Sequence, residues 1–331
     1  MITLITVTVI FFLAWTLGRN NLSNLFGPAV GTRMLPFWFG VLIAGLFVLL
    51  GALISGSATT QNVSALGHVT VLTEALALSI SAGITMFLLS KLGVPASLTQ
   101  TTTGAYIGWN IFHQTVLPVE LVSKTILAWI YTPIIASLVA CCLFYVLRQL
   151  LLRFPVHLLW RDHIIRIGLL CVGAFSAYSF GANNIGSLVG PYMNLGLFSK
   201  SLLFFGACLG IGFGFIFADK RVIKTVSTGM FPLSPAEAFM AVFASALTLF
   251  LFSSIQLKLF LTALHLPSFP LVPVPLSCAV IGAIIGIAVS KGINGLKFKI
   301  VGKVIFSWLT APLGAGLLSF GILYLFRLGG I

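Results

Sequence analysis

Long apolar runs occupy most of this 331-residue chain and leave few folds open to it. A helix needs roughly 17 to 25 predominantly apolar residues to cross a hydrocarbon core. Runs of about this length lie at 2–17, 35–55, 68–91, 95–112, 121–147, 165–181, 199–218, 229–254, 275–290 and 301–326. Charged residues make up only 7% of the chain, against about a quarter in soluble domains. The sequence therefore predicts an all-α, polytopic, multi-pass integral membrane protein surrounded by membrane lipid.

The first run is expected to be a span and not a cleaved leader. It lacks a positively charged start and an A-x-A-like cleavage site.

A basic amphipathic stretch, residues 148–166, separates the fifth run from the sixth. We expect it to lie on the cytoplasmic membrane surface as a linker between two halves, residues 1–147 and 167–331. Short cytoplasmic loops collect Lys and Arg, and this orientation places thirteen of the 18 cations inside. Both termini are then outside, and the inner cell membrane is the expected location. The net charge of +13 follows from this topology and does not indicate a nucleic-acid partner.

Two polar motifs recur in the same order in each half. Gly18-Arg19-Asn20-Asn21 corresponds to Gly181-Ala182-Asn183-Asn184, and VPASLTQ at 94–100 corresponds to VPVPLSC at 272–278. Five spans per half place the halves in opposite orientations across the membrane. Inverted repeats with interrupted helices are typical of secondary transporters. We therefore predict two inverted repeats of about five spans each, with broken or re-entrant helices at these motifs.

The polar side chains of these motifs predict an anion site. An interrupted helix exposes backbone N–H groups, and its N-terminus attracts negative charge. Hydrogen bonding between helices is the alternative explanation for the same Asn and Ser side chains. An intramembrane arginine either adds charge to the site or reaches the interface. The predicted substrate-binding residues are Arg19, Asn20, Asn21, Asn24, Ser97, Thr99, Asn183, Asn184, Ser187 and Ser277.

Motifs for enzymatic or metal chemistry are missing from the sequence. Its five cysteines lie in apolar runs without C-x-x-C spacing, and its five histidines lie near span ends without paired spacing. We predict neither an enzyme, nor a metal site, nor a bound cofactor.

GRNNLSNLFGPAVG at 18–31 and GANNIGSLVGPY at 181–192 resemble the duplicated G-A-N-D-V-A-N-A-x-G signature of the inorganic phosphate transporter (PiT) family. VPASLTQ and VPVPLSC resemble degenerate copies of its P-V-S-T-T-H motif, and residues 227–247 resemble a segment in which an acidic residue follows a Thr-Gly turn. The resemblance implies a dimeric inverted-repeat symporter that binds phosphate and cations between the signatures. The family also includes sulfate permeases.

Several positions depart from the family pattern. Asn21 and Asn184 stand where the family has Asp, Ile43 lies near the position of another acid, and Gln100 and Cys278 replace the family's histidine. Sulfate carries no proton and needs only donors, so the loss of carboxylates favours sulfate. We predict a sulfate permease driven by proton symport. The alternatives are a phosphate symporter coupled to protons or sodium, and an anion channel or non-transporting scaffold.

Proton coupling has few candidates, since the chain contains only five acids. Asp162 and Asp219 lie beside basic residues, and Glu120 lies in a predicted outer loop. Glu74 and Glu237 lie within or at the edge of apolar runs, where a buried carboxylate can carry a proton. We favour Glu237, because the family motif matches there. Glu74 has an ordinary helix-end interaction as its alternative.

Overall fold

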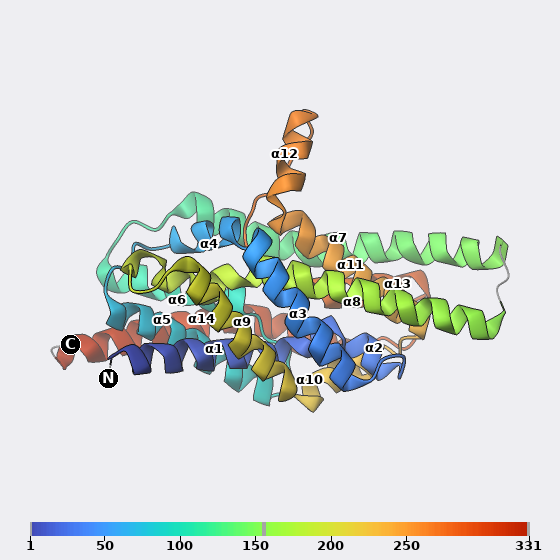
Figure 1. Cartoon of the computed structure of the whole chain (residues 1–331), viewed down its shortest axis with the longest axis horizontal. Coiled ribbons are helices and arrows are strands. Elements are labelled where there is room, and N and C mark those ends of the chain that lie inside the picture. Colours follow the sequence, from blue (N-terminus) through green and yellow to red (C-terminus); the bar gives the residue numbers. More distant parts are fainter. Residues whose placement is uncertain (1, 154–156, 330–331) are drawn as a thin grey trace.

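The computed structural model describes residues 2–153 and 157–329, and all regular structure in these ranges is helical (Figure 1). The longer elements are α1 (Ile2–Leu25), α3 (Phe37–Ser55), α5 (Leu72–Lys91), α6 (Leu98–His113), α7 (Val119–Arg153), α8 (Leu158–Val189), α9 (Lys200–Ile216), α11 (Pro235–Ser253), α13 (Leu276–Ser290) and α14 (Phe298–Leu328). The shorter elements are α2 (Gly27–Gly31), α4 (Ser57–Ser64), η1 (Gly190–Leu195), α10 (Lys220–Lys224), η2 (Thr225–Gly229) and α12 (Ile255–Ala263).

Six described helices are long and apolar enough to cross a membrane, and a bent pair adds a seventh. In that pair, Lys200–Ile216 and Lys220–Ser227 meet at 72°. The prediction of an all-α multi-pass membrane protein is therefore confirmed, whereas ten full spans are not found among the described residues. The expected runs at 95–112 and 275–290 form α6 and α13, whose 16 and 15 residues correspond to roughly 22 to 24 Å. Each follows an extended, proline-containing segment that shortens it.

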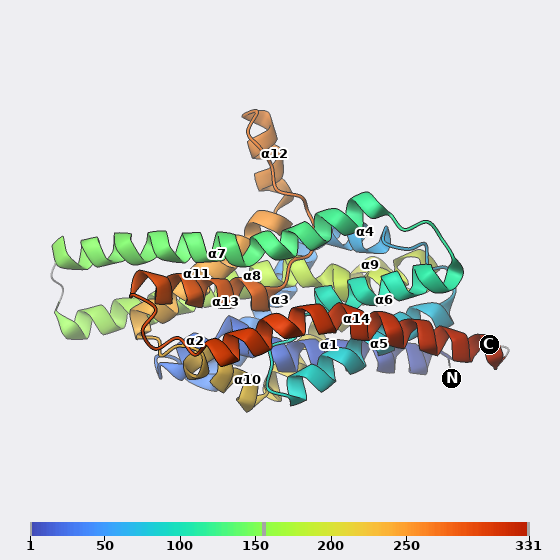
Figure 2. The same ribbon diagram turned by 180° about the vertical axis from the view of Figure 1, so that it is seen from behind.

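Residues 148–166 are helical for most of their described length, and their expected place on the membrane surface stays a prediction. α7 continues through Arg153 and α8 begins at Leu158, so most of this stretch extends two long helices; residues 154–156 lie outside the described ranges. Leu, Arg and Gln favour helix, which agrees with these extensions. Figures 1 and 2 show the ends of α7 and α8 projecting together beyond the other helices. The division at this point into two halves stays a prediction.

The first glycine of each signature does not break its helix, contrary to our expectation. α1 continues past Gly18 to Leu25, and α8 continues past Gly181 to Val189. A methyl group at Gly18 would overlap the carbonyl oxygen of Ile211 on α9, and one at Gly181 would overlap that of Val48 on α3. These glycines allow close helix packing, and the interruption comes later, at the Gly-Pro pairs that open α2 and η1.

A second set of close packings joins α6 to α14 and α7 to α13. Gly104 lies against the backbone of Pro312, and Gly282 lies against the backbone of Pro133. One turn further on, Gly108 meets Gly316 and Gly286 meets Ser137. Small residues four apart let two helix backbones approach where lipid supplies no hydrophobic driving force.

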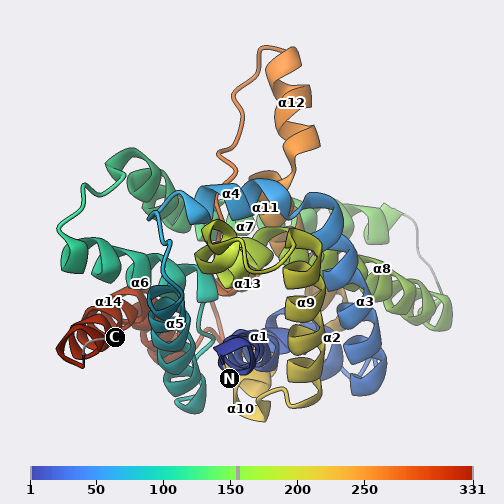
Figure 3. The ribbon, with the colours of Figure 1, turned by 60° about the vertical axis from the view of Figure 1, so that its left-hand side comes forward.

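One segment stands away from the bundle. α12 and the chain that follows it project from the packed helices in all three views (Figures 1, 2 and 3). No residue of α12 is buried, whereas the segment becomes buried again from Leu271 onward and leads into α13.

Gly104→Ala should lower the apparent melting temperature of the detergent-solubilised protein. The added methyl overlaps the carbonyl oxygen of Pro312, and overpacking of this kind costs about 1 to 3 kcal/mol. Gly321→Ala on α14 is the matched control, because nothing lies within 4 Å of its added carbon and alanine favours helix. Equal melting temperatures for the two variants would contradict the close packing.

Candidate anion site

The signature-bearing helices, α1 and α8, pack against α13 and α6, the helices that follow the two Pro-containing motifs. We call these motifs, residues 94–100 and 272–278, the hairpin tips. α1 packs against α8 and α13, and α6 packs against α8. The Thr102 hydroxyl on α6 donates to the Ser187 carbonyl on α8 at 3.0 Å. The Val274 N–H, just before α13, donates to Asn183 Oδ1 at 3.0 Å. These two hydrogen bonds join α8 to α6 and to the segment that precedes α13.

Nine of the ten predicted site residues are buried. None of the nine is more than 5% exposed, although all have polar side chains. Buried polar side chains in a membrane protein either form hydrogen bonds between helices or bind a ligand. Atoms with a protein partner indicate the first role, and atoms without one are compatible with the second.

The amides of Asn21 and Asn184 bind their own helices in the same way. Asn21 Nδ2 donates to the Leu17 carbonyl at 3.0 Å, and Asn184 Nδ2 donates to the Phe180 carbonyl at 3.2 Å. Asn21 Oδ1 accepts from Asn24 Nδ2 at 3.0 Å. One of the two N–H groups of each side-chain amide is therefore used four residues back along the helix. Convergence of Asn21 and Asn184 on one anion stays a prediction.

Other polar atoms of the same motifs have no partner within the described chain. They comprise donors and hydroxyls on one hand and amide oxygens on the other. The donors and hydroxyls are Asn20 Nδ2, Asn183 Nδ2, Ser187 Oγ and Ser277 Oγ; the acceptors are Asn20 Oδ1, Asn24 Oδ1 and Gln100 Oε1. Each unpaired buried group costs about 1 to 3 kcal/mol, and a polar ligand in contact with these seven atoms, together called the motif cluster, would offset that cost.

The hydroxyls near the first hairpin tip are paired with one another. Ser97 Oγ and Thr99 Oγ1 lie 2.8 Å apart, and Ser97 also accepts the Gln100 N–H at 3.4 Å as the N-cap of α6. Ser97 therefore has a structural role at the start of α6. Its contact with the substrate stays a prediction.

Arg19 has a partner other than an anion. Its guanidinium lies 2.9 Å from Asp219 Oδ2 and within 5.5 Å of the ring centres of Trp15 and Phe87. Asp219 in turn caps α10 by accepting the Arg221 N–H at 3.0 Å. These contacts favour a role for Arg19 in joining α1 to α10, and they give no support to its predicted role in substrate binding.

Glu237 joins the start of α11 to the end of α13. Glu237 Oε2 accepts the Ser234 N–H at 2.7 Å in a capping box, and Glu237 Oε1 lies 2.8 Å from Lys291 Nζ, just after α13. The proton-carrying role of Glu237 stays a prediction.

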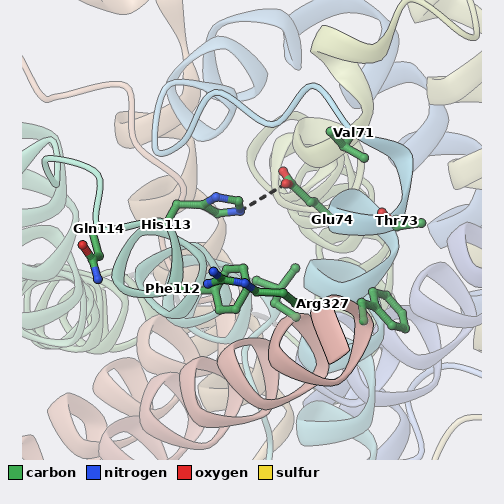
Figure 4. Close-up of a pocket in the computed structure, with 9 residues that line it drawn as sticks. Val71, Thr73, Glu74, Phe112, His113, Gln114 and Arg327 are labelled. Atoms are coloured by element: carbon green, nitrogen blue, oxygen red, sulfur yellow. Dashed lines mark ion pairs between the residues drawn. The ribbon is translucent and has the colours of Figure 1, made fainter. Parts of the chain in front are cut away.

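Glu74 joins the start of α5 to the end of α6 (Figure 4). Its Oε2 accepts from Trp109 Nε1 at 2.8 Å, and its Oε1 lies 3.1 Å from His113 Nε2 at the end of α6. The helix-end interaction considered for Glu74 is therefore present. Sequence reasoning missed the partners His113 and Lys291; their signal is that each stands at the end of the helix that follows a Pro-containing motif.

The described residues contain no group of three or more His, Cys, Asp or Glu side chains able to hold a metal ion. The five cysteines are free.

Comparison with known proteins supports this description of the fold. A solved structure titled "The sodium-dependent phosphate transporter" superposes with a TM-score of 0.80 at 18% identity, covering 99% of each chain. Two similar proteins carry the name "Putative phosphate permease". The one from Methanocaldococcus jannaschii is 27% identical over 94% of this chain and 93% of its own length; the one from Haemophilus influenzae is 23% identical over 94% and 93%.

Residues 17–264, which are most of the chain, match the phosphate transporter family. The protein is thus an integral, multi-pass membrane transporter in class. The chain belongs to that family, which confirms the resemblance at the level of the family; membership of a sulfate permease branch finds no support.

Asn183→Leu should destabilise the protein, whereas Asn20→Leu should not. Leucine at 183 leaves the buried Val274 N–H without its acceptor, a loss of about 1 to 3 kcal/mol. Asn20 occupies the matching position, but both of its amide atoms lack a protein partner. Thermal unfolding of both variants without phosphate measures the difference. An equal loss in the two would mean that the Asn183 bond contributes nothing.

Proposed function

We propose that this protein transports inorganic phosphate across the membrane, and that its motif residues bind the ion. Family membership and the names of its relatives support phosphate. The sulfate interpretation drawn from the Asn-for-Asp replacements has no such support, and the phosphate alternative fits the comparisons better.

The observation that carries this proposal is the mixture of unpaired groups in the motif cluster. The side chain of Asn20 by itself presents one unpaired donor, Nδ2, and one unpaired acceptor, Oδ1. Interchanging the amide nitrogen and oxygen would therefore still leave one unpaired donor and one unpaired acceptor. Sulfate offers only acceptors and would leave the three amide oxygens unpaired. Monohydrogen or dihydrogen phosphate offers acceptors together with one or two O–H donors. A co-transported cation could bind the same amide oxygens, whereas sulfate alone satisfies none of them.

We also propose that the two halves are inverted repeats. Matched contacts support this: Gly18 packs on α9 as Gly181 packs on α3, and Gly104 packs on α14 as Gly282 packs on α7. Exchanging the halves converts each packing into its counterpart. The amides of Asn21 and Asn184 make the corresponding bond four residues back. Such a construction suits alternating access around a central site.

Protons are the coupling ion in this proposal, with sodium as the alternative. Asn replaces Asp at both signature positions, which removes negative charge from a cation site. A homodimer, and an inner-membrane location with both termini outside, remain predictions.

Proteoliposomes should accumulate labelled phosphate when a proton gradient is imposed, and sulfate should compete weakly. Asn20→Leu should abolish uptake, because it removes one donor and one acceptor from the cluster while keeping the fold. Gly321→Ala, far from any packed neighbour, is the matched control and should retain uptake. Uptake of sulfate but not phosphate would overturn the proposed substrate. Accumulation driven by sodium alone would replace the proton as coupling ion.

A further inference from the structure

Two helical hairpins carry motif residues at their tips and an acid–base pair at their open ends. In the first hairpin, α5 and α6 join at residues 92–97, and Glu74 pairs with His113 at the opposite end. In the second hairpin, α11 and α13 are joined through α12, and Glu237 pairs with Lys291. In both, the acid is the third residue of the first helix, and the base ends or directly follows the second. We call these the His113 staple and the Lys291 staple.

The staples lie at opposite ends of the bundle. Arg327, in the last turn of α14, lines the cavity beside the His113 staple, whereas Lys291 comes shortly before the first turn of α14. The 31 residues of α14 correspond to about 46 Å. The two pairs therefore hold the two hairpins from opposite ends of the molecule.

The chemistry of the bases differs. A lysine ammonium ordinarily keeps its charge across the physiological pH range, whereas an imidazole gains and loses a proton there. His113 borders an open cavity of about 550 Å³, so protons from solution reach it. The charged or titratable groups lining that cavity, from α5, α6 and α14, are Glu74, His113 and Arg327 (Figure 4).

We propose that His113 is a positioning residue whose protonation fixes the first hairpin and thereby the substrate-binding groups at its tip. The imidazolium attracts the Glu74 carboxylate and holds the open ends of α5 and α6 together. Loss of the proton leaves a weaker neutral contact and allows the helices to splay. The α6 helix transmits that change to Thr99 and Gln100, about 20 Å away along the helix.

The sign of the effect follows from the charges. Acidification on the His113 side strengthens the staple and should tighten phosphate binding, whereas alkalinisation should weaken it. Because the ion pair is partly exposed, at 31% for His113 and 16% for Glu74, the change in affinity should be modest, roughly two- to fivefold. Arg327 lines the same cavity, but the direct 3.1 Å contact of His113 is with Glu74.

The test compares His113→Lys, which is charged at every pH used, with His113→Gln, which is never charged. Phosphate KM and kcat are measured in proteoliposomes between pH 5 and 8 on the His113 side. The phosphate KM of the wild type should match that of His113→Lys at pH 5 and that of His113→Gln at pH 8. The difference should appear in KM and not in kcat. Phosphate ionisation is common to all three, so the ratio of variant to wild type removes it. Lys291→His should create the same dependence on pH at the opposite face.

Trp109 provides a readout that needs no transport. Its ring centre lies 4.6 Å from that of His113, and an imidazolium quenches indole fluorescence. The wild-type spectrum minus that of Trp109→Phe should change with pH, and His113→Gln should abolish the change. The inference rests on the proposed function only through the substrate. A pH-dependent Trp109 signal without phosphate uptake would therefore overturn the substrate and not the staple. Unchanged pH dependence of KM in His113→Gln would overturn the staple.

Discussion

Backbone-to-backbone packing at glycine is the constraint on which the rest of the structure depends. Four close packings, α1 on α9, α3 on α8, α6 on α14 and α7 on α13, each join one of the helices up to α7 to one of the helices from α8 onward. The first and second parts of the chain are therefore packed into one another. Lipid is as apolar as the helix surfaces, so close contact, rather than hydrophobic burial, holds these pairs together.

This packing places polar groups where water cannot reach them. The signature helices remain regular through their Asn pairs, and their amides can bind only their own carbonyls, a hairpin tip or a ligand. Asn183 finds the Val274 N–H, whereas its counterpart Asn20 finds no partner. The two motifs are therefore alike in sequence but differ in which amide atoms lack a hydrogen-bond partner. An anion that carries both O–H donors and acceptor oxygens is the kind of ligand that can pair with the unpaired motif atoms.

The sequence predicts the helical membrane class and the burial of the motif residues well, because apolar runs and repeated Asn pairs are local patterns. It predicts the course of the helices less well. Gly18 looks like a helix breaker until its neighbour, Ile211, is known, and only the tertiary contact explains it. The ends of α7 and α8 carry charge at the spacing of a surface helix, yet they extend two spans. The place of His113 at a helix end is visible in the sequence, but its partner is not, since Glu74 lies 39 residues earlier in the chain.

The acids of the chain bear on how charge is balanced during transport. Four of them have a basic partner within 4 Å among the described residues, namely Glu74, Glu120, Asp219 and Glu237. The remaining acid, Asp162, is exposed. No acid among the described residues is therefore both buried and without a basic partner, and a cation at the motif cluster would have to rely on neutral amide oxygens. Those oxygens accept equally well from the O–H groups of a protonated phosphate. A proton that travels on the substrate itself needs no dedicated carboxylate, so the loss of both signature aspartates is compatible with coupled phosphate transport.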